Sequence, residues 1–163
     1  MTKPPDVGTP APDFTLESVS VTAGMARRGS ATLSQERGHP VVLAFYPGDD
    51  TPVCTKQLCS YTFELAQFAE LDAVVWGISP QDLTSHEKFA RRNALGFPLL
   101  ADTTKSVIDA YGVGMIGLGV RRSVFVVDAA GVVRWRFIGL LGLRYPDAAT
   151  IAGQVRALSV ADR

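Results

Sequence analysis

Residues 41–59 read VVLAFYPGDDTPVCTKQLC, and this stretch decides the expected fold. Its first six residues form an unbroken apolar run without polar alternation, which is typical of a strand buried on both faces of a covered sheet. The run stops at Pro47-Gly48, and after the polar loop Pro52 can serve as the first helical residue. Apolar side chains then recur at three- or four-residue spacing, at Leu58, Tyr61, Leu65 and Phe68. The segment therefore predicts a strand, a loop and a helix from about Pro52 to Glu70.

The rest of the chain alternates strand and helix patterns. Prolines keep the N-terminus extended up to residues 14–16, and residues 20–30 predict a hairpin or surface loop. The later elements that the patterns predict are a strand at 73–78, a helix at 82–94 with Gly96 as its cap, an extended piece at 97–100, a helix at 105–111, strands at 123–128 and 132–138, and a helix at 147–158. Parallel strands need helical crossovers, whereas the turn at 129–131 makes the last two strands antiparallel. This order predicts an α/β, thioredoxin-like fold with a central mixed β-sheet flanked by helices.

Length and composition restrict the class of protein. The 163 residues suit a single domain spanning 1–163, and no repeat or linker divides them. Lys plus Arg equals Asp plus Glu at 16 each, so no overall charge attracts nucleic acid or an anionic membrane. Apolar runs fall short of the roughly 18 residues of a membrane helix, and the N-terminus lacks the apolar core of a secretory signal. A compact cytoplasmic protein is expected.

Two cysteines are too few for a disulfide scaffold, which draws attention to their chemistry. Cys54 falls in the first turn of the predicted helix, where unpaired backbone N–H groups and the positive end of the helix dipole favour an anion. The thiolate is such an anion, and it is the nucleophilic form of cysteine. Position alone therefore makes Cys54 a candidate nucleophile.

The spacing between Cys54 and Cys59 predicts a conformational requirement. Residues five apart on an ideal helix have Cα atoms about 8–9 Å apart and lie about 140° apart around the axis. A disulfide needs Cα atoms about 4.4–6.8 Å apart. If the two cysteines pair, the first turns of the helix must therefore unwind, and oxidation is coupled to a local order-to-disorder change.

Other interpretations of the cysteines are weaker. Cys59 could serve as a small buried hydrophobe of the helix. A zinc site built from Cys54, Cys59, His39 and His86 lacks the spacing of common structural sites. Four residues between the cysteines, instead of two, disfavour a Cys-x-x-Cys dithiol oxidoreductase.

Two further patterns carry little functional weight. Residues 112–117 match the G-x-G-x-x-G dinucleotide fingerprint, but they follow a helix and precede a strand, the reverse of the order that nucleotide binding requires. An apolar loop near the active site, or part of a dimer or partner surface, is the expectation for residues 112–119. His86 and the pair Arg91-Arg92 are expected on a solvated helix face, and His39 in a loop.

Residues 45–59 resemble the active-site segment of a peroxiredoxin, most closely of the Q-type, or bacterioferritin-comigratory, branch. The specific pattern is Pro47, three residues, Thr51, two residues and Cys54, with Cys59 five positions further on. Further similarity lies at residues 8–16, 77–80, 97–102 and 122–128. The resemblance thus extends along most of the chain.

The resemblance implies a thiol-dependent peroxidase acting on hydrogen peroxide and organic hydroperoxides. Cys54 would be the peroxidatic cysteine and Cys59 the resolving cysteine, joined in an intramolecular disulfide. By the same analogy Thr51 hydrogen-bonds the peroxide, Pro47 shields the sulfur, and Arg122 stabilises the thiolate and the transferred oxygen. A thioredoxin-like dithiol would regenerate the enzyme, a monomer or weak homodimer without metal, haem or another cofactor. A thiol-disulfide oxidoreductase and a non-catalytic redox-sensing protein are the alternatives.

The chain also departs from the usual pattern of that branch. Val53 replaces a usual glycine and Gln57 a usual glutamate, while residues 60–63 replace an acidic, aromatic, Arg-Asp stretch. These changes bear on how easily the helix opens and on recognition of the reductant. Strand alternation points Arg121 and Arg122 to opposite faces, and the resemblance selects the second. The stretch 20–30 is longer than usual, without a functional account.

Overall fold

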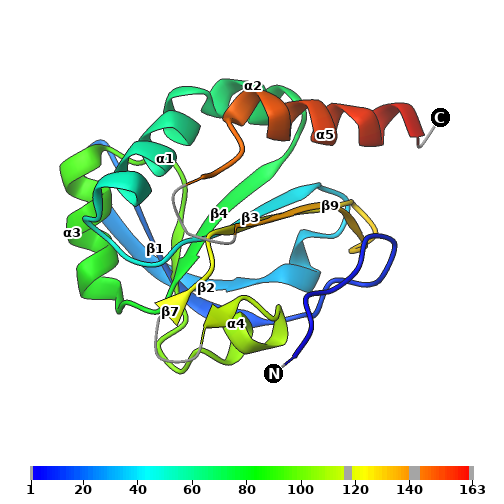
Figure 1. The fold of residues 1–163 in the computed structure, drawn as a ribbon. Coiled ribbons are helices and arrows are strands. Elements are labelled where there is room, and N and C mark those ends of the chain that lie inside the picture. Colours follow the sequence, from blue (N-terminus) through cyan, green and yellow to red (C-terminus); the bar gives the residue numbers. More distant parts are fainter. Residues whose placement is uncertain (1, 116–118, 140–143, 162–163) are drawn as a thin grey trace.

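The computed structural model describes residues 2–115, 119–139 and 144–161, and its centre is a seven-stranded sheet (Figure 1). The strands lie in the order β2-β1-β5-β4-β3-β8-β9. Their bounds are β1 Thr15–Thr22, β2 Met25–Thr32, β3 Val41–Phe45, β4 Val74–Ser79, β5 Leu99–Ala101, β8 Ser123–Val127 and β9 Val133–Ile138. A separate two-stranded ribbon pairs β6 (Gly114–Met115) with β7 (Gly119–Val120).

The sheet is mixed, as the order of the elements predicted. Strands β3, β4 and β5 run parallel, whereas β8 is antiparallel to β3 and β1 is antiparallel to β5. Two antiparallel hairpins, β1–β2 and β8–β9, form the two edges. The hairpins expected around residues 20–30 and 129–131 are therefore confirmed.

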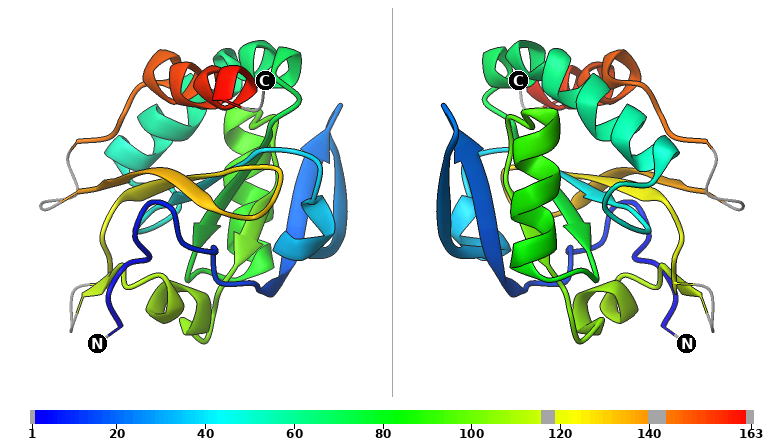
Figure 2. Two further views of the ribbon diagram at one scale, coloured as in Figure 1. Left: turned by 90° about the vertical axis from the view of Figure 1, so that its right-hand side faces the viewer. Right: turned by 90° about the vertical axis from the view of Figure 1, so that its left-hand side faces the viewer.

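Helices cover both faces of this sheet. They are α1 Pro52–Phe63, α2 Leu65–Glu70, α3 Leu83–Asn93, α4 Ser106–Ala110 and α5 Ala148–Ala161, with a 3₁₀ turn at Leu33–Glu36. Figure 1 shows α1, α2 and α5 together above the sheet and α4 below it. The turned views show the β1–β2 hairpin standing at one edge, with α3 beside it (Figure 2). Within the described residues, no helix combines the length and apolar character needed to cross a bilayer.

Strand β3 lies in the middle of the core, and all of its residues are buried. Its side chains alternate between two hydrophobic clusters. Val42, Ala44 and the following Tyr46 pack with residues of α1, α3 and α5, whereas Val41, Leu43 and Phe45 pack with residues of α4. This alternation explains why the strand sequence has no polar positions, because both of its faces are covered.

Two predicted helix boundaries are wrong. The helix expected from 52 to 70 is broken at Glu64, whose ψ of 14° is not helical, so α1 and α2 are separate. The cap of α3 is Ala94, in the left-handed conformation with φ 50°, and not Gly96. Gly96 instead lies against the junction of α1 and α2, where a Cβ atom would come within 2.9 Å of the Leu65 side chain. Its N–H donates to Thr62 Oγ1 at 3.2 Å, so close tertiary contact explains this glycine.

Candidate functional site

The site begins where β3 ends and α1 starts. Residues 46–51 form the connecting loop, in which Thr51 Oγ1 donates to the carbonyl oxygen of Gly48 at 3.1 Å. Pro52 is the first residue of α1, where its missing N–H costs nothing, and Cys54 is the third. Pro47 is half-buried and Thr51 is exposed. The structure thus places Cys54 in the first helical turn, as the sequence predicts.

Arg122 contacts the sulfur of Cys54 directly. Its guanidinium donates from Nη2 to Cys54 Sγ at 3.1 Å, and both side chains are buried, with exposed fractions of 2% and 0%. Arg122 directly precedes β8, which pairs with β3, and Ser123 lies opposite Phe45 at the end of β3 that leads to α1. A cation held against the sulfur, together with the N–H groups of the first helical turn, favours the thiolate. The two residues therefore bring a sulfur and a guanidinium into contact beside the hydrophobic cluster that α1 covers.

Gln57 links this pair to the rest of α1. Arg122 Nη1 donates to Gln57 Oε1 at 2.6 Å, and Gln57 Nε2 donates to the hydroxyl oxygen of Tyr61 at 3.0 Å. That hydroxyl donates in turn to the carbonyl oxygen of Pro146 at 2.6 Å. Burial raises the pKa of Tyr61, so the hydroxyl remains a donor. The amide that replaces a usual glutamate thus orients the guanidinium without neutralising its charge.

Cys59 lies one and a half turns after Cys54 on α1. It is half-buried, and both cysteines are free thiols. Burial raises the pKa of Cys59, which keeps its thiol protonated. The two sulfurs thus differ in their surroundings: a guanidinium contacts Cys54, whereas Cys59 is half-buried further along the helix.

The loop before α1 is held by a group that sequence reasoning missed. Asp49 Oδ2 lies 2.7 Å from His86 Nδ1, and its other carboxylate oxygen accepts from the Tyr46 hydroxyl at 2.8 Å. His86 was expected to be solvated, but it is fully buried. The signal was available, because His86, Phe89 and Ala90 have the spacing of one helix face, and all three are buried. By contrast, Arg91 and Arg92 are exposed, as expected.

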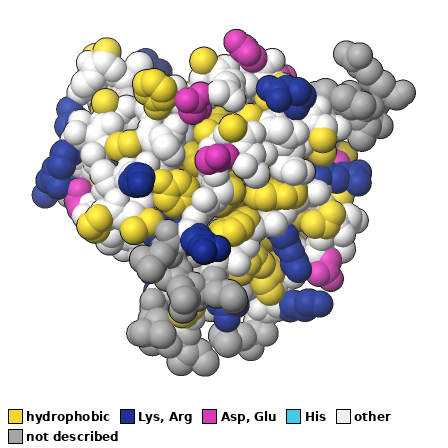
Figure 3. Space-filling view, turned by 45° about the horizontal axis from the view of Figure 1, so that its top comes forward, with side chains coloured by type: hydrophobic (Ala, Val, Ile, Leu, Met, Phe, Trp, Pro, Cys, Tyr) yellow, Lys and Arg dark blue, Asp and Glu magenta, His cyan; other side chains and the backbone are white. Residues whose placement is uncertain are grey.

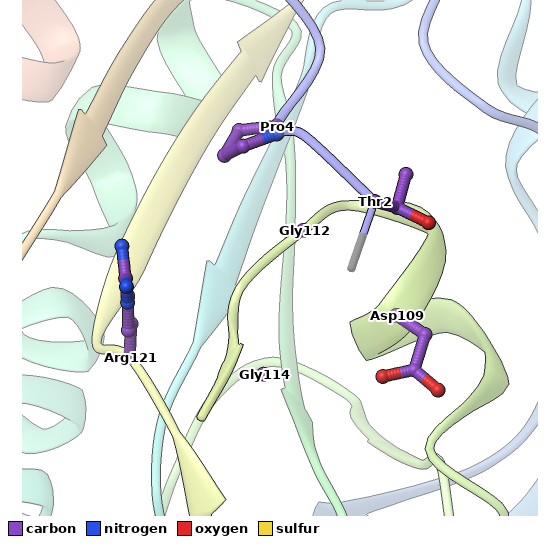
Figure 4. A pocket seen from close by; sticks show the side chains of 6 residues that line it. All are labelled: Thr2, Pro4, Asp109, Gly112, Gly114 and Arg121. Carbon is purple, nitrogen blue, oxygen red and sulfur yellow. The ribbon is translucent and has the colours of Figure 1, made fainter. Parts of the chain in front are cut away.

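Arg121 points to a different part of the molecule. It lines an open cavity of about 670 Å³ with Thr2, Pro4, Asp109, Gly112 and Gly114 (Figure 4). Among the described residues this cavity contains none of the candidate catalytic residues. Part of the glycine-rich loop expected at 112–119, namely residues 116–118, lies outside the described residues.

The two histidines are engaged away from the cysteines. His39 Nδ1 lies 2.8 Å from Asp72 Oδ2 at the surface, and His86 pairs with Asp49. In the described part of the chain, no three His, Cys, Asp or Glu side chains gather in a way that could hold a metal ion. The described residues thus offer no preformed set of metal ligands.

Comparison with known proteins identifies the family. Residues 7–136 match the AhpC/TSA family. The chain belongs to the AhpC/TSA family. Two relatives from this family are peroxiredoxin Q, chloroplastic, of Oryza sativa subsp. japonica, 38% identical over 130 residues, and peroxiredoxin Bcp of Bacillus subtilis (strain 168), 34% identical over 140 residues. The resemblance of residues 45–59 to a Q-type peroxiredoxin is therefore confirmed.

The extent of these matches differs between relatives. The alignment covers 78% of this chain and 57% of the rice protein, so this member of the family spans little more than half the length of that relative. The alignment with the Bacillus protein covers 80% of this chain and 85% of the Bacillus protein.

Solved structures support the fold. The reduced 2-Cys peroxiredoxin of Plasmodium vivax superimposes with a TM-score of 0.85 at 26% identity, covering 96% of this chain and 98% of the other. AhpC of Mycobacterium tuberculosis superimposes with a TM-score of 0.83 at 21% identity, and the alignment covers 96% of this chain and 99% of the other. The predicted thioredoxin-like fold is confirmed.

Proposed function

We propose that this protein is a thiol-dependent peroxidase that reduces hydrogen peroxide and organic hydroperoxides at Cys54. The observation that carries the proposal is the guanidinium of Arg122, 3.1 Å from the sulfur at the start of α1. A cation and several helix N–H groups around one buried sulfur suit a reaction that begins with a thiolate and transfers negative charge to oxygen. Membership of the family supports the same activity.

In the first step the Cys54 thiolate attacks one oxygen of the peroxide. The S–O bond forms as the O–O bond breaks, and its electron pair leaves on the other oxygen, which takes a proton and departs as water or alcohol. Cys54 is left as a sulfenic acid. Arg122 stabilises the thiolate and the charge on oxygen, and Pro47 shields the sulfur. Thr51 donates its own hydroxyl proton to Gly48, which leaves its oxygen to accept a hydrogen bond from the peroxide O–H.

In the second step Cys59 resolves the sulfenic acid. Its sulfur attacks the sulfur of Cys54, a disulfide forms, and water leaves. The helical spacing of the two residues requires the first turns of α1 to unwind before the sulfurs meet. The end of α1 is anchored by the hydrogen bonds of Tyr61 and Thr62 to other elements. Unwinding is therefore confined to the turns that carry Cys54.

We infer that a thioredoxin-like protein dithiol reduces this disulfide. Phe63, one turn beyond Cys59, is 86% exposed, and Glu64 and Asp147 line a cavity of about 370 Å³ beside it. With the helices tilted forward, hydrophobic side chains gather across the middle of this face, and charged ones are scattered around them (Figure 3). A protein that docks on this surface would bring its dithiol close to Cys59. A protein with an apolar rim, neutral or basic, fits it better than a small thiol does.

The compartment and the oligomeric state of the protein are proposed as well. We place it in the cytoplasm, because a reducing compartment favours the return of a Cys54–Cys59 disulfide to two thiols. A single domain over 1–163, acting as a monomer or weak homodimer, is proposed as its working form.

The experiment that tests this function follows peroxide consumption with excess reductant for wild type, Cys54→Ser and Cys59→Ser. We expect activity to be lost in Cys54→Ser, while Cys59→Ser accumulates a sulfenic acid that mass spectrometry detects. Undiminished consumption by Cys54→Ser would refute the proposal. Insulin reduction without peroxide consumption would indicate a thiol-disulfide oxidoreductase, and disulfide formation without turnover would indicate a redox sensor.

A further inference from the structure

A buried pair of side chains, Asp49 and His86, lies behind the loop that carries Pro47 and Thr51. The imidazole of His86 is fully buried, and the side chain of Asp49 is 2% exposed. His86 Nδ1 lies 2.7 Å from Asp49 Oδ2, and Nε2 lies 3.1 Å from the carbonyl oxygen of Leu100. Nδ1 also lies 3.3 Å from the Tyr46 hydroxyl oxygen, so both ring nitrogens have hydrogen-bond partners. His86 is therefore held between Asp49 and the backbone of β5.

The carboxylate of Asp49 is fully engaged. It also accepts hydrogen bonds from the Tyr46 hydroxyl at 2.8 Å and from Ser85 Oγ at 2.7 Å. Burial, followed by the charge of Asp49, raises the pKa of Tyr46 well above its usual value, which keeps its hydroxyl a donor. A buried polar network in which every member has a partner is rigid, because breaking any link leaves a charge or dipole uncompensated.

This network attaches the loop to α3. Asp49 N–H donates to Gln81 Oε1 at 3.1 Å, and Gln81 Nε2 donates to the carbonyl oxygen of Pro47 at 3.4 Å. Arg92 Nη1 donates to Asp50 Oδ1 at 2.7 Å. Asp50 has a φ of 62°, a conformation that costs a non-glycine residue about 1–2 kcal/mol and persists only where neighbours impose it. Pro47, Asp49 and Asp50 are thus bonded to α3 and the turn before it. The carbonyl oxygen of Thr51, in contrast, accepts hydrogen bonds from Thr55 of α1.

We propose that the Asp49–His86 pair is a positioning device that holds residues 47–50 against α3 and thereby places Pro47 and the adjoining Thr51 where the peroxide binds. The loop then stays in place when the first turns of α1 unwind, and the returning Cys54 meets a preformed peroxide site. The inference rests on the proposed peroxidase function. Neither Asp49 nor His86 touches the reacting sulfur, so both act through the loop.

The test compares two reactions of the same sulfur in the full-length reduced protein. Peroxide reacts at a site that the loop shapes, whereas alkylation of Cys54 by iodoacetamide does not need the hydrogen bond of Thr51 to the peroxide. His86→Asn should lower the second-order rate constant for hydrogen peroxide by at least about tenfold, because small misplacements of positioning groups cost that much or more. Its alkylation rate should stay close to that of wild type. A merely structural role would lower both rates together or only the unfolding temperature.

Two further variants keep the test decisive. His39→Asn removes a histidine with the same Nδ1-to-aspartate contact at the surface, and should change neither rate. In Asp49→Asn combined with His86→Asn, two neutral amides replace the pair, so no buried charge is left without a partner. This variant too should show a lowered ratio of peroxide to iodoacetamide rates. A wild-type ratio in both His86 variants would overturn the inference. If wild type itself reacts with peroxide no faster than free cysteine, it is the peroxidase function that fails.

Discussion

Disulfide formation between Cys54 and Cys59 should open the N-terminal half of α1. In the reduced protein three hydrogen bonds hold these turns: Arg122 to Cys54, Arg122 to Gln57, and Gln57 to Tyr61. None of them survives the displacement of Cys54 toward Cys59. The Cα separation must shrink from about 8–9 Å to below about 6.8 Å, which an intact helix does not permit.

The size of the effect follows from these contacts. Hydrogen bonds to charged groups contribute about 1.5–3 kcal/mol net each, and neutral ones about 1 kcal/mol, so opening the reduced helix costs about 4–7 kcal/mol. At about 1.4 kcal/mol per factor of ten, its amides should exchange about 10³- to 10⁵-fold more slowly than in an open chain. Oxidation to the disulfide should remove most of this protection.

Hydrogen exchange followed by mass spectrometry measures this directly. The peptide 51–61 should exchange quickly in the disulfide form and slowly in the reduced form, while a peptide from α3, 83–93, remains protected in both. Oxidised Cys59→Ser, which cannot form the disulfide, should keep the slow exchange of the reduced protein. A disulfide form with full protection across 51–61 would refute the reasoning about helix geometry.

Three other predictions follow from the described contacts. Phe63→Ser should raise the KM for a thioredoxin-like donor without changing turnover supported by dithiothreitol, whereas Met25→Ser, which removes another exposed hydrophobe, should change neither. Tyr61→Phe, which loses two hydrogen bonds in a buried setting, should destabilise the protein by about 1–3 kcal/mol in urea titrations, and an unchanged midpoint would count against the network. Burial alone would raise the pKa of Asp128, but hydrogen bonds from backbone N–H groups and Arg134 lower it below 3.8. The ionised Asp128 therefore stabilises the folded protein above that pH, and this stabilisation is lost as the pH falls through the lowered pKa. Asp128→Asn should therefore cost about 1–3 kcal/mol in urea titrations at neutral pH and nothing in strong acid, and a cost independent of pH would contradict this assignment.

Local patterns predicted the elements better than their ends. The apolar run of β3 and the proline at the start of α1 are signals carried by neighbouring residues, and both elements lie where they were expected. The break at Glu64 and the cap at Ala94 were not predicted. Gly96, which follows the end of α3, packs against Thr62 and Leu65 on either side of the break, and such packing between segments leaves no periodic mark in the sequence.

In the candidate site, too, some features follow from the local sequence and others from the packing of distant segments. The sequence by itself determined that Cys54 begins a helix after a buried strand, because apolar spacing and a proline at the first helical position act within a few residues. It also determined the five-residue spacing that forces α1 to unwind if a disulfide forms. Only the tertiary structure decided that a guanidinium meets the sulfur and that a buried histidine holds the loop. Arg122 is 68 residues from Cys54, and His86 is 37 residues from Asp49, and contacts over such separations arise when the sheet and helices pack together.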